Sequence, residues 1–393
     1  MKNAIIIALV ATFANSAWAV GNIKLGTVEI NPTASIKQSY DSNIYLKATD
    51  LKSSLINRSA IGVNLLNKFG PKLELSGGYM LEQLSYSRSA GINDATHHTA
   101  NLGLKAKLPR DASLSIDDNF MDTTDQATSE LTERAQRVQN TATLKMEAPL
   151  RGKFGYGIDV QHNYNDYKLL SNDALDRAET LAGFNVSYQL QPKTKVFLGY
   201  TYGDLKYDNS TYETGDATYN NIDVGVMGNL APKLVGIVKA GTQMRNYKNS
   251  LVSGGITADD NSSLATYSAQ LQWKALEKTE IVGFAKRANV ETSGSVSRYY
   301  TSTLSDLSAS REVRKIKLTV GGSFETVEYP EALSTTSDKK RFDHNTNLRF
   351  TAEYNMQTWL KAGLGYQYKN RTSNVETNDY KDNVIGLELK GMF

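Results

Sequence analysis

Residues 384–393 read VIGLELKGMF, and residues 342–354 read FDHNTNLRFTAEY. In the first stretch, apolar residues alternate with polar or small ones, as Leu387 and Leu389 do with Glu388. Successive side chains of a β-strand point to opposite faces of the sheet, so each stretch predicts a strand with one apolar and one polar face. The same alternation recurs in residues 315–325 and 360–369.

The polar faces of these strands carry charges that lipid does not tolerate. A charged side chain on the lipid side of a barrel strand costs about 2–4 kcal/mol at the bilayer midplane. Apolar positions such as Leu348, Phe350 and Leu387 are therefore expected to contact lipid, and the charged positions to line water. A soluble periplasmic protein is the first alternative, because residues 20–393 contain no apolar run long enough for a transmembrane helix.

Composition favours the membrane barrel over that alternative. The chain of 393 residues contains 22 Tyr, 29 Gly, 7 Pro and no Cys. Many strands that are polar inside and apolar outside, with aromatic residues near their ends, account for this usage. With 44 Lys and Arg against 41 Asp and Glu, the charge balance gives no reason to expect a nucleic-acid partner.

Five of the seven prolines recur at intervals of 38, 40, 43 and 40 residues. Each lies in a short polar turn with a basic neighbour, and proline cannot donate a hydrogen bond to an adjacent strand. Two strands with one short and one long connection account for this period, which predicts about eighteen strands, or between roughly 16 and 18. The five prolines are Pro71, Pro109, Pro149, Pro192 and Pro232.

The connections between these turns are longer and rich in Asp, Asn, Ser, Thr and Gly. Short turns at one rim and long polar loops at the other are typical of the periplasmic and extracellular ends of outer-membrane barrels. The sequence therefore predicts an all-β fold, a transmembrane antiparallel up-and-down β-barrel over residues 31–393. The expected long loops are residues 88–96, 123–134, 169–177, 207–217, 249–263, 330–339 and 373–380.

Residues 1–19 are expected to be a signal peptide. Lys2 supplies a positive start, residues 4–13 are apolar, and residues 17–19 read AWA, a small-residue cleavage site. The apolar stretch is too short to span a bilayer, which argues against an uncleaved anchor. Residues 20–30 would then be a short periplasmic segment before the barrel, and the expected location is the outer membrane of a Gram-negative cell.

The polar phase of the strands is expected to line the lumen, with basic residues in mild excess. Together with Asn, Gln, Ser and Thr, these charges predict a wet channel that hydrogen-bonds hydroxylated or anionic cargo. The basic excess favours anionic solutes; the alternative is that the charged groups pair with one another as ordinary lumen lining. The candidate lumen-lining residues are Lys105, Lys145, Lys239, Arg245, Lys317, Arg349, Lys361, Lys369, Glu388 and Lys390.

Catalytic and metal-binding patterns are weak. The chain has four histidines, no cysteine, and no hydrolase or zinc-protease motif. His97 and His98 are adjacent and so point to opposite faces of a strand, which favours surface histidines over a shared metal. The acidic loop residues 204–208 and 259–261 could bind Ca²⁺, although solvated loop acids are more common. We therefore expect no enzyme, no catalytic residue, no cofactor and no metal site.

Two local features resemble known outer-membrane barrels. The chain ends on Phe393 in an alternating strand, and such barrels typically end on an aromatic residue that the assembly machinery reads, so Phe393 is the expected assembly signal. Residues 31–32 (Asn-Pro), the alternating residues 34–40 and the motif YDSNIY at 40–45 resemble the opening strand of the putative β-barrel porin 2 family. Ser42 stands where that family usually has a second Asp.

The resemblance implies a role in exopolysaccharide or capsule export, with the barrel as the exit pore for the polymer. It implies as partners the outer-membrane lipid, the barrel-assembly machinery and periplasmic polysaccharide-export proteins. Two alternatives stay open: a diffusion porin for small polar or anionic solutes, and a mainly structural, adhesive or enzymatic barrel. An exporter predicts a wide lumen, whereas a porin predicts a long loop folded inward with opposed Arg and acidic clusters. Residues 249–263 lack an Arg cluster, which favours the exporter.

Overall fold

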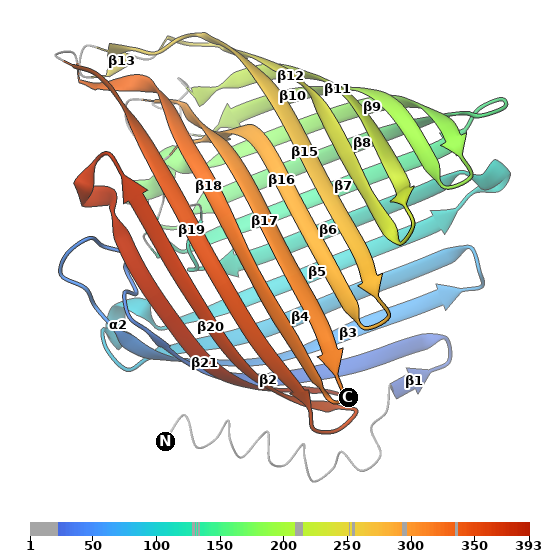
Figure 1. The fold of residues 1–393 in the computed structure, drawn as a ribbon, viewed down its shortest axis with the longest axis horizontal. Coiled ribbons are helices and arrows are strands. Elements are labelled where there is room, and N and C mark those ends of the chain that lie inside the picture. The colour runs from blue at the N-terminus through green and yellow to red at the C-terminus, as the bar shows by residue number, and fades with distance from the viewer. Residues whose placement is uncertain are drawn as a thin grey trace.

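Alternating apolar and polar residues form long strands throughout the computed structural model, and these strands close into an antiparallel barrel (Figure 1). The structure describes residues 23–127, 130, 132, 134–208, 215–250, 252–253, 256–292, 297–334 and 337–393. Eighteen strands of these described residues form the wall, which confirms the predicted fold class and strand number. They are β2 (Val28–Asp41), β3 (Ser54–Phe69), β4 (Leu73–Tyr86), β5 (Ala95–Lys107), β6 (Ser113–Thr123), β7 (Arg137–Pro149), β8 (Phe154–Tyr167), β9 (Arg177–Gln191), β10 (Thr194–Tyr207), β11 (Ala217–Ala231), β12 (Leu234–Tyr247), β15 (Asn261–Leu276), β16 (Thr279–Glu291), β17 (Tyr299–Val313), β18 (Ile316–Ser334), β19 (Ser337–Asn355), β20 (Leu360–Ser373) and β21 (Tyr380–Met392).

The barrel closes by pairing its first and last wall strands. Thr33 of β2 lies opposite Met392 of β21, and the pairing continues to Asp41 opposite Val384. The other wall strands pair antiparallel with their neighbours in sequence, so the topology is up-and-down. None of the helices in the described ranges is long and apolar enough to cross a bilayer.

The predicted alternation is present in the wall. Leu387 is 65% exposed on the outer face, and Leu348 is 50% exposed. Arg349, one residue away from Leu348, instead reaches Asp306 two strands away, a contact that is possible only across the concave inner face. The outer face is therefore an apolar band of the kind that contacts acyl chains.

The two rims differ as the prolines predicted. Four of the five predicted turn prolines lie in short connections at one rim, and Pro149 ends β7 beside its turn. The C-terminus lies at this rim (Figure 1), which is the periplasmic side expected for an even number of strands. The other rim carries the long connections, which include α2 (Ala90–Asn93), η3 (Leu170–Leu175), η5 (Glu376–Asn378), β13 (Val252–Ser253) and β14 (Ile256–Thr257).

One predicted loop is wrong. Residues 330–334 belong instead to β18, which continues to Ser334, and residues 337–339 to β19, which begins at Ser337. Pro330 lies where the register between the two strands shifts. A proline is tolerated there because the irregular pairing does not need its missing N–H. These two strands are therefore longer than their neighbours.

The YDSN motif near the start of the barrel fastens the first loop to the last strand. The fully buried side-chain amide of Asn43 donates hydrogen bonds to the backbone carbonyl oxygens of Lys47 and Lys381 at 2.9 and 3.0 Å. Its side-chain oxygen accepts a hydrogen bond from the backbone N–H of Lys47 at 3.1 Å. The hydroxyl of Ser42 donates to Asp382 at 3.1 Å. The motif thus holds the closing seam together.

Both described ends of the chain lie at the short-turn rim. β1 (Ile23–Leu25) pairs with the start of β2, so part of the expected periplasmic segment, residues 20–30, is a short hairpin. The ring of Phe393 lies 5.4 Å from the ring of Trp359, and its backbone N–H donates to the carbonyl oxygen of Pro32 at 2.9 Å. The expected signal peptide, residues 1–19, lies outside the described residues, and the assembly role of Phe393 stays a prediction.

Candidate channel lumen

Charged side chains of the inner wall contact one another across intervening strands. Lys195 of β10 forms an ion pair with Glu147 of β7 at 3.2 Å, and Arg349 of β19 forms one with Asp306 of β17 at 2.6 Å. Side chains meet past an intervening strand only on the concave face of a curved sheet. These groups therefore point into the lumen.

By strand register, the ten candidate lumen-lining residues all lie on this inward phase, and their ion pairing depends on height in the barrel. Four cations in the middle or toward the loop rim are ion-paired: Lys239 with Asp223, Arg245 with Glu291, Arg349 with Asp306 and Lys369 with Asp382. The remaining six residues form no ion pair with a described residue: Lys105, Lys145, Lys317, Lys361 and Lys390 lie toward the short-turn rim, and Glu388 lies nearer the middle of β21. Their contact with cargo stays a prediction.

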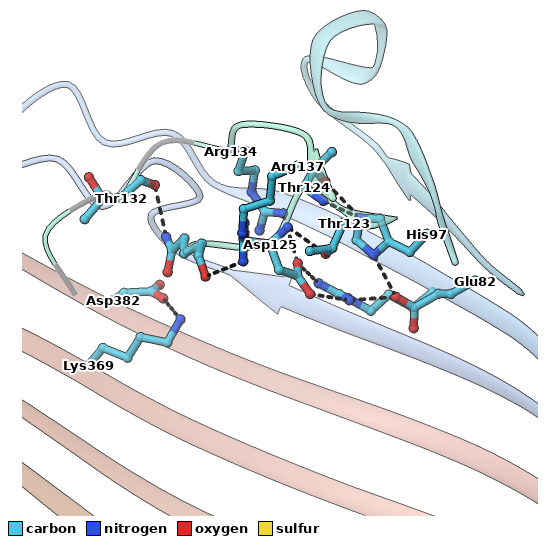
Figure 2. A network of polar contacts seen from close by, with 12 residues as sticks. Glu82, His97, Thr123, Thr124, Asp125, Thr132, Arg134, Arg137, Lys369 and Asp382 are labelled. Atoms are coloured by element: carbon cyan, nitrogen blue, oxygen red, sulfur yellow. Dashed lines mark hydrogen bonds and ion pairs between the residues drawn. The ribbon is translucent and has the colours of Figure 1, made fainter. Parts of the chain in front are cut away.

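In the connection between β6 and β7, the described residues around Asp125 lie against the inner wall of β3 to β5 (Figure 2). Asp125 accepts hydrogen bonds from the guanidinium of Arg58 at 2.6 and 3.2 Å, and Arg58 also donates to Glu82 at 2.8 Å. Arg134 of the same connection lies 3.6 Å from Asp125. Opposite charges therefore fix one part of this loop to the wall.

The same loop also reaches the far side of the lumen. Glu130 accepts hydrogen bonds from the hydroxyl of Thr292, just after β16, at 2.8 and 3.0 Å, and lies 3.7 Å from Arg341 of β19. In the order of strands around the barrel, β16 is nearly opposite β6. The described residues of this connection (124–127, 130, 132 and 134–136) therefore contact both sides of the lumen near its external end, and we call them the bridging loop.

His97 is buried beside the bridging loop, so its interpretation as a surface histidine is wrong. Its Nδ1 lies 3.3 Å from Glu82, and its Nε2 accepts a hydrogen bond from the backbone N–H of Thr124 at 3.0 Å. Figure 2 shows these side chains directed toward one another. His98 faces the other way and meets the hydroxyl of Tyr79 at 2.7 Å, as the alternation requires.

Burial and charge act in opposite directions on the carboxyl group of Asp125. Burial disfavours its ionised form, but the hydrogen bonds and positive charge of Arg58 outweigh this effect and hold the pKa of Asp125 below its ordinary value. Asp125 is therefore an anion at neutral pH. The contact that fixes the bridging loop is a charged one under physiological conditions.

Arginines stack on inward-facing tyrosines around the external end of the lumen. Arg245 is ion-paired with Glu291 and lies 4.7 Å from the ring centre of Tyr219. A guanidinium over an aromatic ring contributes about 0.5–2 kcal/mol. Aromatic residues near strand ends predict rings at the lipid interfaces, and only the phase that these tyrosines share with charged neighbours indicates the lumen. The other pairs are Arg134 with Tyr86, Arg177 with Tyr207, Arg298 with Tyr247, Arg341 with Tyr329 and Arg371 with Tyr380.

Apolar side chains also face inward near the external rim. Ile44, in the connection after β2, packs against Ile56, Leu84 and Tyr86, and all four are buried. The alternation predicted a polar inner face throughout, so this cluster is a correction. It exists because residues 42–53 fold onto the inner wall and need an apolar surface to cover.

The rest of the lumen is open and polar. A cavity of about 1020 Å³ is lined by residues of β5 to β12, β15 and β16, with Gln139, Asn163, Gln243 and Lys286 among its inward residues. Such amides and ammonium groups form hydrogen bonds with polar solutes. No cluster of three or more His, Asp or Glu side chains in the described ranges is arranged to hold a metal ion. Asp260, a loop acid considered for Ca²⁺, is instead paired with Arg298 at 3.2 Å.

The closed eighteen-strand wall, the outward apolar band and the polar lumen crossed by a loop define a porin-like outer-membrane β-barrel. The chain belongs to the family described as Putative beta-barrel porin 2, whose model matches residues 18–393. This confirms the family that the opening motif resembles. None of the curated proteins that were compared matches this chain.

Three solved structures illustrate what the chain is similar to. Outer-membrane expressed OmpT of Vibrio cholerae is 12% identical, with 95% of this chain and 100% of that chain covered and a TM-score of 0.42. The FrpB iron transporter of Neisseria meningitidis is 10% identical, with 92% and 81% covered and a TM-score of 0.42. A mutant of the ferric enterobactin receptor of Pseudomonas aeruginosa is 8% identical, with 93% and 80% covered and a TM-score of 0.46.

Proposed function

We propose that the protein is an outer-membrane channel for the diffusion of small polar solutes, and that the bridging loop sets the largest solute that passes. The observation that carries this proposal is the attachment of one loop both to Arg58, through Asp125, and to Thr292, through Glu130. Eighteen strands enclose a wide lumen, and a loop fixed at two places divides it. A diffusion porin is expected to have such a loop, with opposed arginine and acidic groups.

This proposal departs from the preference drawn from the sequence. That preference rested on residues 249–263, which lack an arginine cluster. The inward loop is a different one, and the arginines that oppose its acids come from the wall: Arg58 on β3 and Arg341 on β19. An exporter of polymers needs a wide lumen, and the bridging loop narrows this one at its external end.

Export of a surface polysaccharide or exopolysaccharide is the second candidate, as the family resemblance implies. One observation favours it: the external end of the lumen carries inward tyrosines stacked with arginines, such as Tyr219 with Arg245. Aromatic faces and guanidinium groups both bind sugars and their acidic substituents. Under this candidate the bridging loop moves aside when polymer passes, and periplasmic export proteins are the partners.

The size limit of the channel tests the first candidate. Liposomes that contain the refolded barrel are placed in solutions of neutral sugars of increasing size, and their swelling is followed by light scattering. We expect small sugars to enter and large oligosaccharides to be excluded. The double variant Asp125→Asn/Glu130→Gln removes both charged attachments of the bridging loop, so it should admit larger sugars. Asp173→Asn/Glu376→Gln, which changes two acids of other loops, should leave the limit unchanged.

Two results would contradict this proposal: no swelling with any sugar, or the same size limit in both double variants. Deletion of the gene in the source bacterium then examines the second candidate. Loss of surface polysaccharide, with uptake of small solutes unchanged, would favour polymer export over diffusion.

The remaining assignments belong to this proposal. We infer that a signal peptide, residues 1–19, directs the chain to the outer membrane of a Gram-negative cell. Barrel-assembly machinery and outer-membrane lipid are the proposed partners. The proposed role is that of a channel, with no catalytic step.

A further inference from the structure

We propose that the inner wall at the short-turn rim, between β3 and β7, binds multivalent oxyanions and so sets the solute class of the channel. This inference rests on the channel function proposed above and deepens it. The wall forms a groove of about 560 Å³. Its basic lining residues are Lys68, Lys72, Lys105, Lys107 and Lys145.

The centre of this groove is a row of three side chains on adjacent strands. Ser115 of β6 is the register partner of both Lys105 on β5 and Lys145 on β7. Neighbouring strands lie about 4.8 Å apart, so the two lysine backbones are about 10 Å apart with the serine hydroxyl between them. The Ser115 hydroxyl forms no hydrogen bond with a described side chain or backbone group, so it is available to donate.

The acidic neighbours of this row form no ion pair with its two lysines: Glu147, which also lines the groove, is paired with Lys195 at 3.2 Å, and Asp117 lies beside Gly103. Glu74, the register partner of Lys105 on β4, lies 3.9 Å from Lys68. Asp159, the register partner of Lys145 on β8, lies over Gly183 of β9, where the missing Cβ leaves room for its carboxylate. Lys105 and Lys145 therefore form no ion pair with a described residue.

Ion pairs of inward cations are less frequent near this rim than toward the external end, although Lys195 near the rim is paired with Glu147. Toward the external end, inward cations such as Arg58, Arg245 and Lys369 are matched by carboxylates. Lysines held near one another without an ion-pair partner repel, and a bound anion relieves that repulsion. The structure thus concentrates unmatched positive charge where a solute would enter from the periplasm.

The rim itself adds to the positive field. The eight short turns between wall strands contain nine Lys or Arg residues and two acids, Asp111 and Glu277. A charged rim around a channel mouth raises the local concentration of oppositely charged solutes. The nine basic residues are Lys72, Arg110, Arg151, Lys153, Lys193, Lys233, Lys278, Arg314 and Lys315.

The spacing of the groups selects the ligand. An ammonium group binds phosphate, sulfate or carboxylate oxygens by charge-assisted hydrogen bonds. A monovalent anion meets one of the two ammonium groups, whereas a solute with two or more anionic groups meets Lys105 and Lys145 at once and also accepts from Ser115. The ligand class is therefore a multivalent oxyanion.

Binding of tripolyphosphate by the folded full-length protein in detergent tests this inference. By isothermal titration calorimetry we expect the wild type to bind, and Lys105→Gln/Lys145→Gln to bind about tenfold more weakly, because two charge-assisted contacts are lost. Lys317→Gln, which removes an unpaired lysine from β18 across the lumen, should bind as the wild type does. Circular dichroism and the heat-dependent shift in gel mobility confirm that each variant is folded.

Absence of binding by the wild type would overturn the inference, as would an equal loss in Lys317→Gln and the double variant, since the anion would then respond only to total charge. The readout is separate from transport. If liposomes swell with neutral sugars but the protein does not bind tripolyphosphate, the channel function is supported and the oxyanion-binding groove is contradicted. If the protein binds tripolyphosphate but the liposomes do not swell, the groove is supported and the channel function is contradicted.

Discussion

At the scale of single residues, Asn43 makes the closing seam depend on one side chain. It is fully buried, and its amide serves three hydrogen bonds to Lys47 and Lys381. Asn43→Ala leaves these backbone groups without their partner, so we expect the barrel to lose about 1–3 kcal/mol of stability. The measurement is the temperature at which the folded form disappears in heat-dependent gel mobility.

The matched control for that substitution is Asn355→Ala at the other rim. Asn355 is exposed, and its side chain makes no hydrogen bond with the described part of the chain. The Asn355→Ala variant should unfold at the same temperature as the wild type. Equal behaviour of the two variants would show that the YDSN motif does not hold the seam.

Asp125 predicts how the bridging loop responds to pH. The groups that face it are Arg58 on β3, Arg134 in its own loop, Glu82 and Tyr86 on β4, His97 on β5, and Arg137 on β7. Its pKa lies below the ordinary 3.8, so its contribution to holding the loop is complete at neutral pH and is lost only as the pH falls through that lowered pKa. Single-channel conductance should therefore stay constant through neutral pH and rise only in strong acid.

The variant Asp125→Asn distinguishes the effect of protonating Asp125 from the effect of protonating other groups. The variant lacks the charge at every pH, so its conductance at neutral pH should already equal the acid value of the wild type. A conductance step of the wild type near neutral pH would assign the attachment to another group.

The alternation of apolar and polar residues predicts which face of the wall a side chain lies on, but it does not predict which side chain it contacts. Arg349 lies on the inward phase as expected, while its partner Asp306 depends on which strands are two apart in the closed barrel. His97 shows the limit most clearly, because its partner Thr124 belongs to a loop whose path no local pattern encodes. Contacts between distant segments require the closed barrel.

At the scale of a strand, β21 gives two adjacent positions with opposite environments. Leu387 and Glu388 lie midway between Asn383, which bonds to Tyr366 near the external interface, and Phe393 at the other rim. Leu387→Lys places a charge in the bilayer near its midplane and should destabilise the barrel by about 2–4 kcal/mol. Urea titration of the folded barrel in lipid vesicles measures this loss.

Glu388→Lys is the control for Leu387→Lys, since it puts the same side chain on the opposite face. It should fold with nearly the stability of the wild type because the ammonium group meets water. A large and equal loss in both variants would mean that the two faces of β21 are not distinguished by lipid.

The limits of strands were predictable where proline or a short polar turn ends them, because a missing N–H breaks the pairing at a fixed residue. The extension of β18 and β19 was not, since Pro330 lies within an irregular part of their pairing. The bridging loop was also missed. Its acids, Asp125 and Glu130, look like the solvated charges of any long loop until the arginines of the wall are placed opposite them.

At the scale of the whole molecule, most ion pairs of the lumen lie toward the external end, and several inward lysines near the short-turn rim form none with a described residue. Across a KCl gradient we expect a reversal potential that reports chloride as more permeant than potassium. Lys361 and Lys390 are register partners of like charge, so Lys361→Gln/Lys390→Gln should reduce this preference. Lys239→Gln/Asp223→Asn removes an ion pair without changing net charge, so it should leave the preference for chloride unchanged.

A preference of the wild type for potassium would contradict this distribution of charge. So would an equal change in the two double variants, because the unpaired lysines would then have no special role. The sequence alone indicated a mild basic excess, and only the pairing in the closed barrel shows which lysines it leaves without partners.

The central claim is that alternate residues of each strand face lipid and water, and thiol labelling tests it most directly. The chain has no cysteine, so single-cysteine variants carry one reactive group each. In intact outer membranes we expect a charged, membrane-impermeant thiol reagent to modify Glu388→Cys and to leave Leu387→Cys unmodified until detergent is added. Modification of Leu387→Cys in the intact membrane, at the rate seen for Glu388→Cys, would contradict the account.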